Sequence, residues 1–167
     1  HFRLTDLIYT HISARLPGRE PRFLINPYGL LFDEITASSL ATVTLAGDVV
    51  DDPTGLGINP AGFVIHAAVH GARHDVGCVM HTHTTAGLAV AAQKHGLLPL
   101  TQHAMRFTGC LAYHDYEGIA LDVDEQAQLV ADLGACNAMI LRNHGLLACA
   151  STVHDTFDLM IHLQRAC

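Results

Sequence analysis

Histidines at two places in this chain have the types and spacing of a metal site. Residues 78–83 (CVMHTH) form an apolar run that ends in two imidazoles at positions i and i+2, which point to the same side of a β-strand. A second apolar run, residues 140–145 (ILRNHG), ends in another histidine. Three imidazoles with one open coordination position are how proteins hold a catalytic divalent metal. We therefore predict that His81, His83 and His144 bind Zn²⁺ or another divalent transition metal.

The alternative interpretation is that these histidines are polar residues at strand ends, hydrogen-bonded to the backbone. That interpretation is the better one for an isolated histidine. The H-x-H pattern at a strand end, combined with a distant N-H-G, favours metal binding. Thr82, Thr84 and Asn143 are expected to help orient the rings.

The composition limits the class of protein. The 167 residues are 50% hydrophobic and 15% charged, which fits one globular domain over residues 1–167. A net charge of -7 and nine scattered basic residues argue against nucleic acid as a partner. No apolar stretch is long enough to cross a bilayer, so we expect no membrane association. The five cysteines form no C-x-x-C pair, which favours free thiols and a cytoplasmic location.

The pattern of apolar residues predicts alternating strands and helices. Residues 3–12 carry Leu4, Leu7, Ile8 and Ile12 at helical spacing. Further helices are expected at 61–73, from Thr84 or Thr85 to 94, at 123–133 and after Thr152; strands are expected at 22–26, 42–45 paired with 49–50, 77–83, within 107–121, and at 138–141 continuing through 146–149. This order favours a layered α/β or α+β domain with a mixed sheet. The absence of a G-x-G-x-x-G or Walker A sequence excludes the common nucleotide-binding motifs.

Taken together, the motifs resemble those of the class II aldolase/adducin family over nearly the whole chain. The matching segments are 12–15 (ISAR), 23–29 (FLINPYG), 72–76 (ARHDV) followed by 81–83 (HTH), and 141–145 (LRNHG). The resemblance implies a three-layer α/β/α sandwich with a central mixed, largely antiparallel sheet. It also implies a cyclic homotetramer with active sites between subunits. Enzymes of this family cleave or epimerise small sugar phosphates through a zinc-stabilised enediolate.

The chain departs from the family pattern at the residues that perform acid/base chemistry. Aldolases of the family carry Ser-Ser-Glu at the entry to the central helix, where this chain has Pro60, Ala61 and Gly62. The Gly-Asn that precedes Ile/Val-Ser in the family is here Thr10-His11. The usual acid/base and much of the phosphate cradle are therefore missing, and an ordinary sugar-phosphate aldolase is not expected.

Other residues could supply a base near the metal. The segment 113–118 (YHDYEG) is dense in proton-transfer groups, and we favour Tyr113, His114 and Glu117 as catalytic residues. The alternative for this segment is a polar surface loop. His66, His70, His103 and Tyr116 are further candidates for this base. His66 and His70, one helical turn apart, are equally well explained as polar residues packed beside the sheet.

Four residues are candidates for holding an anionic substrate. Arg15, Asn26, Gly29 and Arg142 could meet a carboxylate or phosphate, together with backbone N–H groups at the helix start near Ala61. The two arginines could equally be structural, tying loops to backbone carbonyls.

The leading hypothesis is a divalent-metal-dependent, aldolase-like enzyme acting on a small hydroxy-carbonyl or sugar-acid compound. The reaction would be C–C cleavage, decarboxylation or epimerisation by enolate or enediolate chemistry. The alternatives are a catalytically inactive, adducin-like binding or scaffold domain, and a metal-containing binding protein without turnover.

Overall fold

The strands form one mixed sheet through the middle of the molecule. The structure is a computed structural model and describes residues 2–18, 20–118 and 123–167. In sheet order the described strands are β4 (Val49–Asp51), β3 (Ala41–Thr44), β2 (Arg22–Ile25), β1 (His11–Arg15), β5 (Cys78–Thr82), β8 (Gly145–Ala150), β7 (Ala138–Leu141) and β6 (Leu111–His114). Among these strands, β6 and β7 pair in parallel and the other neighbours are antiparallel.

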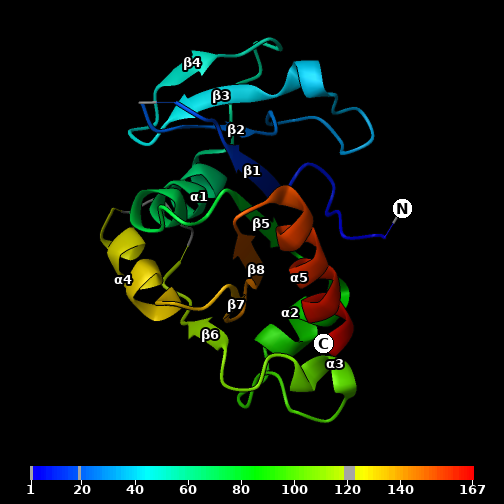
Figure 1. Ribbon diagram of the computed structural model, residues 1–167. Helices are drawn as coiled ribbons and strands as arrows, with labels where there is room; N and C mark the ends of the chain where they lie inside the picture. The colour runs from blue at the N-terminus through cyan, green and yellow to red at the C-terminus, as the bar shows by residue number, and fades with distance from the viewer. Residues whose placement is uncertain (1, 19, 119–122) are drawn as a thin grey trace.

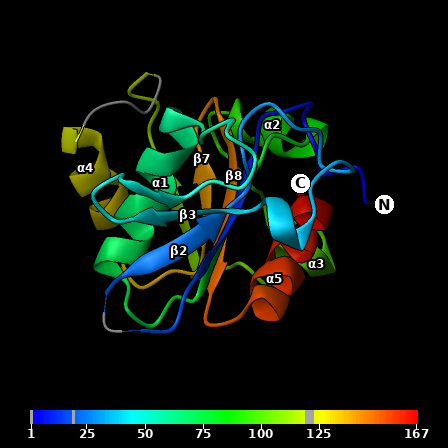
Figure 2. The same cartoon turned by 90° about the horizontal axis from the view of Figure 1, so that it is seen from above.

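Helices cover both faces of this sheet (Figure 1). The described helices are α1 (Pro60–Ala72), α2 (Thr85–Ala91), α3 (Gln102–Met105), α4 (Val123–Leu133) and α5 (Val153–Ala166), with a 3₁₀ turn at Ala37–Ser39. Figure 2 shows α1 and α4 on one side of the strands and α3 and α5 on the other. The expected three-layer α/β/α sandwich with a largely antiparallel sheet is confirmed.

Each face of the sheet has its own apolar core. Strands β5, β7 and β8 are buried along their whole length, so they are apolar on both faces. On the side of α1 and α4, Val69 and Leu133 pack with Leu147 of β8. On the other side, Met160 of α5 packs with Leu146. Burying each such side chain contributes about 1.5–3 kcal/mol, which fixes the central strands that carry the histidines.

Side-chain caps begin α1, α2 and α5 within one residue of the starts that the sequence predicts. The Asn59 carboxamide oxygen accepts a hydrogen bond from the Ala61 N–H, with Pro60 in the first turn of α1. Thr84 and Thr152 cap α2 and α5 in the same way.

The helix predicted for residues 3–12 is wrong. This segment makes a turn closed by an Asp6–Tyr9 bridge, Leu7 has a positive φ of 50° and is 68% exposed, and β1 begins at His11. The reason is tertiary, since β2 and β5 flank β1 and satisfy its backbone hydrogen bonds on both sides. Local apolar spacing cannot reveal such partners.

Three smaller differences concern the second half of the chain. Residues 138–149 are not one continuous strand, because the chain reverses between β7 and β8. Helix α2 ends at Ala91 rather than near residue 94, and α3 was not predicted. Within 107–121 the described part holds one strand, β6, while residues 119–121 lie outside the described residues. No helix in the described ranges is long and apolar enough to span a membrane.

Candidate metal centre

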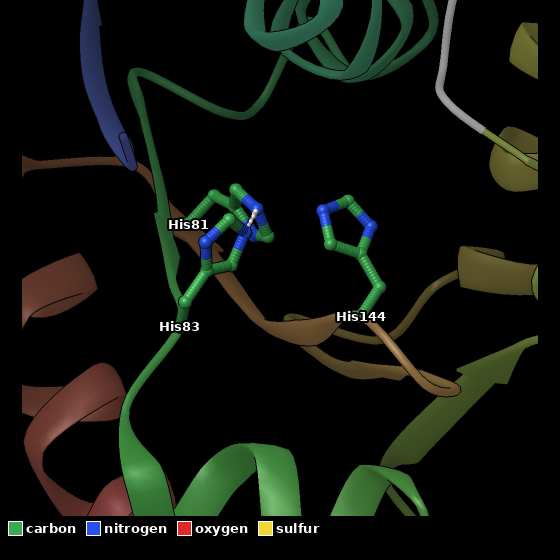
Figure 3. A group of neighbouring side chains, drawn as sticks. All are labelled: His81, His83 and His144. Atoms are coloured by element: carbon green, nitrogen blue, oxygen red, sulfur yellow. Dashed lines mark hydrogen bonds between the residues drawn. The ribbon is translucent and has the colours of Figure 1, made fainter. Parts of the chain in front are cut away.

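Strand β5 and the β7–β8 turn bring three histidines together. His81 is the penultimate residue of β5 and His83 follows its end. Asn143 adopts the left-handed region at φ 57°, which asparagine tolerates better than most residues, and its N–H donates to the Ala91 carbonyl. This turn aims His144 at the other two rings, as Figure 3 shows. One nitrogen from each ring lies within 4.8 Å of the others.

The outer nitrogens of the β5 histidines are fixed by acceptors. His81 Nδ1 lies 3.0 Å from the Leu146 carbonyl oxygen, and His83 Nδ1 lies 3.1 Å from an Asp6 carboxylate oxygen. Both acceptors require Nδ1 to carry the proton, so in the neutral rings each Nε2 has a free lone pair. These two Nε2 atoms face each other at 2.8 Å. Two lone pairs at this distance repel, and a shared cation removes the repulsion.

Burial keeps these imidazoles in the form that binds metals. It is the main reason why the pKa of His81 is well below its ordinary value, with neighbouring His144 and His83 adding to the effect. Burial and the nearby His83 and His114 lower the pKa of His144 to about 4. Neutral imidazoles with their second nitrogen held by a carbonyl or carboxylate suit Zn²⁺ and related ions. The donor set present therefore fits a divalent transition metal.

The three histidines open into a cavity of about 280 Å³. Its other lining residues include Tyr9, His11, Asn59, Gly62, Ile65 and Tyr116. The cavity lies between the start of α1 and the end of β5, so a small molecule bound here would contact the candidate metal ligands.

His11 and Gly62 form a pair that the sequence interpretation missed. Their separate departures from the family pattern are visible in the sequence, but their proximity is not. His11 and His81 are directly opposite in β1 and β5, and their rings are nearly parallel at 15° with centroids 6.4 Å apart. A Cβ atom at Gly62 would lie 2.4–2.6 Å from three atoms of the His11 ring. The missing side chain at Gly62 is therefore what makes room for His11.

The structure separates the three predicted catalytic residues. The Tyr113 hydroxyl accepts a hydrogen bond from the Leu97 N–H at 3.0 Å and packs among apolar residues on the α2, α3 and α5 side, away from the histidine cavity. His114 and Glu117 border a small cleft beside His144. His114 Nδ1 lies 2.8 Å from Asp132, while its Nε2 has no partner among the described residues. Of the other groups considered in this segment, Tyr116 lines the histidine cavity.

The predicted substrate-binding arginines make structural contacts. The Arg15 guanidinium donates to the backbone carbonyls of Val76 at 3.0 Å and Arg73 at 3.2 Å, and also to that of His70. Arg142 donates to the Gln93 carbonyl at 3.2 Å. These contacts favour the alternative in which the arginines tie loops to carbonyls.

The other two candidates also lie outside the histidine cavity as described. Asn26 accepts from the Ile12 N–H at 3.0 Å and donates to the Thr10 carbonyl at 3.4 Å, holding β1 in place. Gly29 occupies an exposed turn with a φ of 95°. Thr82 donates to the Met160 sulfur on the opposite face of the sheet, so the ring-orienting groups are instead Asp6 and the Leu146 carbonyl.

A buried polar network lies behind the cavity. Ser13 Oγ is 2.6 Å from His66 Nδ1 and 2.8 Å from His70 Nε2, and both histidines are fully buried. Burial, followed by the nearby Arg15 charge, lowers the pKa of His70 to about 4. His66 and His70 therefore pack beside the sheet as neutral polar residues.

This network predicts acid sensitivity of the metal-free protein. In the unfolded chain a histidine has a pKa near 6.5, so between pH 6.5 and 4 the unfolded state binds more protons and folding weakens as pH falls. The contribution of neutral His70 to the free energy of unfolding is complete above pH 6.5. Its loss between pH 6.5 and pH 4 lowers that free energy by about 3 kcal/mol. Urea unfolding with a chelator at several pH values checks this. We expect a shallower pH dependence in His70→Asn and no change in the exposed control His95→Asn; a flat wild-type profile would contradict it.

The fold and the cavity define a three-layer α/β protein with three convergent histidines at an open site. The model for the class II aldolase and adducin N-terminal domain matches residues 1–167, and the chain belongs to this family. The resemblance noted in the sequence is thereby confirmed.

Curated relatives include both aldolase-like proteins and adducins. A candidate class 2 aldolase protein of Pseudomonas aeruginosa is 59% identical over 163 residues, 97% of this chain and 62% of its own length. Mouse alpha-adducin is 46% identical over 168 residues, 99% of this chain and 23% of its own length. The chain thus spans less than two thirds of the length of these curated relatives.

Solved structures share the fold closely. An aldolase II superfamily protein from Pseudomonas syringae has a TM-score of 0.97 at 60% identity, covering 99% of this chain and 66% of that chain. An L-fuculose 1-phosphate aldolase from Glaciozyma antarctica has a TM-score of 0.87 at 30% identity, covering 98% of this chain and 64% of that chain.

Proposed function

We propose that this chain is the metal-binding domain of a divalent-metal-dependent, aldolase-like enzyme. Its substrate is a small hydroxy-carbonyl or sugar-acid compound, and its reaction is C–C cleavage, decarboxylation or epimerisation by enolate or enediolate chemistry. The observation that carries the proposal is the pair of inward-facing Nε2 atoms of His81 and His83, 2.8 Å apart, with both Nδ1 atoms committed to other acceptors.

The roles of individual residues follow from their positions. His81, His83 and His144 hold the ion, which we take to be Zn²⁺; when bound, such an ion supplies Lewis-acid polarisation of a carbonyl or hydroxyl pair. Asp6 and the Leu146 carbonyl keep the two β5 rings oriented.

Proton transfer is assigned to groups near His144. His114 is the preferred candidate because its Nε2 is buried without a partner among the described residues, while Asp132 fixes Nδ1. Glu117 borders the same cleft but is exposed, so it ranks second. Tyr113 ranks last because its hydroxyl is committed to the Leu97 N–H.

An inactive, adducin-like scaffold is the second candidate. The observations that favour it are Gly62 in place of the expected acid and the 46% identity with alpha-adducin. A scaffold role does not require three converging neutral imidazoles, and we therefore rank the metal-dependent enzyme as the first candidate function. The third candidate is a metal-containing binding protein without turnover. It would use the same three-histidine site as the enzyme and would differ from it only in forming no product.

The domain organisation, cellular location and oligomeric state of the chain are also part of the proposed function. We propose that residues 1–167 act as a single domain within a cytoplasmic homotetramer. Light scattering at micromolar concentration tests the assembly, and a monomer mass would contradict it.

Metal content tests the proposed site directly. Protein purified without a histidine tag or added metal is expected to contain about one divalent metal per chain, and His81→Ala/His83→Ala is expected to contain none, because one imidazole cannot hold the ion alone. Elemental analysis measures both, with the exposed pair His74→Ala/His95→Ala as a matched control. No metal in the wild type would leave the scaffold as the better interpretation. Metal without turnover of hydroxy-carbonyl substrates would favour the binding protein.

A further inference from the structure

The His11 imidazole is buried at the edge of the histidine cavity and lacks a protein partner. Only 5% of the residue is exposed, yet neither ring nitrogen has a hydrogen-bond partner among the described residues. A neutral imidazole carries one N–H donor and one acceptor nitrogen. Leaving such groups unsatisfied costs about 1–3 kcal/mol, and native structures rarely tolerate that without a reason.

The position of His11 excludes it from the metal-ligand set as described. The nitrogens that lie within 4.8 Å of one another belong to His81, His83 and His144, and His11 is not among them. Its ring lies beside His81 with a centroid distance of 6.4 Å, and it lines the same cavity. His11 is therefore placed to contact a molecule bound at the three histidines rather than the ion itself.

The absence of a side chain at Gly62 leaves the space that the His11 ring occupies. A side chain at Gly62 would overlap His11, since even a Cβ would lie 2.4 Å from the nearest ring atom. The His11 ring also meets His66 edge-on, with centroids 5.8 Å apart. Held between α1 and β5, the imidazole has a defined place against the cavity.

The charge of the cavity indicates the kind of molecule that fits. None of the described residues that line it is an aspartate or glutamate. Asp6 contacts His83 Nδ1, on the far side of the ring from the nitrogen that faces His81. A divalent cation on three neutral imidazoles would keep most of its charge here, and that charge attracts an anion.

We propose that His11 is a ligand-contact residue that hydrogen-bonds an oxygen of a small 2-hydroxy carboxylate held at His81, His83 and His144. This inference rests on the proposed function, because it requires metal at the three histidines. It narrows the substrate class to small hydroxy acids and assigns their recognition in part to a residue outside the metal-ligand set.

Glycolate and glycolamide test the proposal because they share a skeleton and differ by one charge. Each is titrated into zinc-loaded protein and followed by ligand-observed NMR, with zinc content measured in the same samples. We expect glycolate to bind at least fivefold more tightly than glycolamide. His11→Phe, which keeps a flat ring against Gly62, is expected to weaken glycolate binding about 5- to 10-fold through loss of one hydrogen bond, without loss of zinc. The exposed control His95→Asn should bind as the wild type does.

The other outcomes are distinct. Equal glycolate affinity in wild type and His11→Phe would overturn the contact, and equal binding of the two probes would overturn the preference for an anion. Loss of zinc in His11→Phe would show that His11 is needed for metal binding, and would also overturn its assignment as a contact to the bound hydroxy acid. If His11→Phe does not fold, His11→Leu carries the same expectation and the same contradicting results. Absence of zinc from the wild type would instead overturn the proposed function.

Discussion

Replacing Gly145 by alanine is expected to lower the free energy of unfolding by about 2–3 kcal/mol and to weaken metal binding about 10- to 100-fold. A Cβ at this position would lie 2.5 Å from the Thr82 carbonyl oxygen, 3.0 Å from the His83 ring and 3.3 Å from the His81 ring. The first contact is with the backbone of Thr82, which pairs with Leu146 at the end of the β5–β8 ladder and cannot move without disturbing that pairing. The rings that hold the metal would shift with it.

Chemical denaturation and zinc titration measure the two effects. Gly71→Ala is the matched control, because Gly71 lies in α1 and a Cβ there meets nothing within 4 Å. It should stabilise the fold by about 0.4–1 kcal/mol and leave metal affinity unchanged. If Gly145→Ala behaves like Gly71→Ala, the proposed close packing of β8 against the histidine rings is wrong.

The second large effect is expected from the Gly62–His11 pair. Gly62→Ala alone should destabilise the protein by about 1–3 kcal/mol, because the new methyl group overlaps the buried His11 ring. In a His11→Ala background the same substitution should be neutral or stabilising by up to about 1 kcal/mol, since alanine is the better helix former. The sign of the effect therefore depends on the residue at position 11.

A double-mutant cycle over Gly62→Ala and His11→Ala checks this by denaturant unfolding. We expect a coupling energy of about 1–3 kcal/mol, in the range of residues in direct contact. Additive effects would show that the two residues do not contact each other, and that the glycine at position 62 does not serve to accommodate the His11 ring.

The parts of the fold that were predicted correctly are those where local chemistry is decisive. Asn59 and Thr152 each begin a helix because a side-chain oxygen accepts a hydrogen bond from a backbone N–H of the first turn, and at α1 Pro60 also lacks an N–H that would need a partner. The apolar run at Ala138–Leu141 is a central strand because a strand buried on both faces must be apolar throughout. Such signals need no distant partner.

The errors occur where distant segments decide. Residues 3–12 have helical apolar spacing, yet β1 begins at His11 and pairs antiparallel with β2 and β5, whose paired residues lie 8 to 70 positions further along the chain. The chain reversal at Asn143 depends on a left-handed residue and a hydrogen bond to Ala91 of α2. The sequence shows an asparagine there, but it does not show the Ala91 carbonyl at the end of α2 that accepts the hydrogen bond from its N–H.

The family, the layered α/β class and the three candidate metal ligands could be predicted from the residues alone, because alternation along a strand and the residues of the N-H-G turn are local properties. The groups that surround the three histidines depend on how distant segments pack together. Asp6 comes from a turn more than 70 residues before His83, and the His11 ring fills the space left by Gly62 on another element. Such contacts form when elements that are distant in the sequence pack against each other across the sheet. The spacing of residues along the sequence therefore does not predict them.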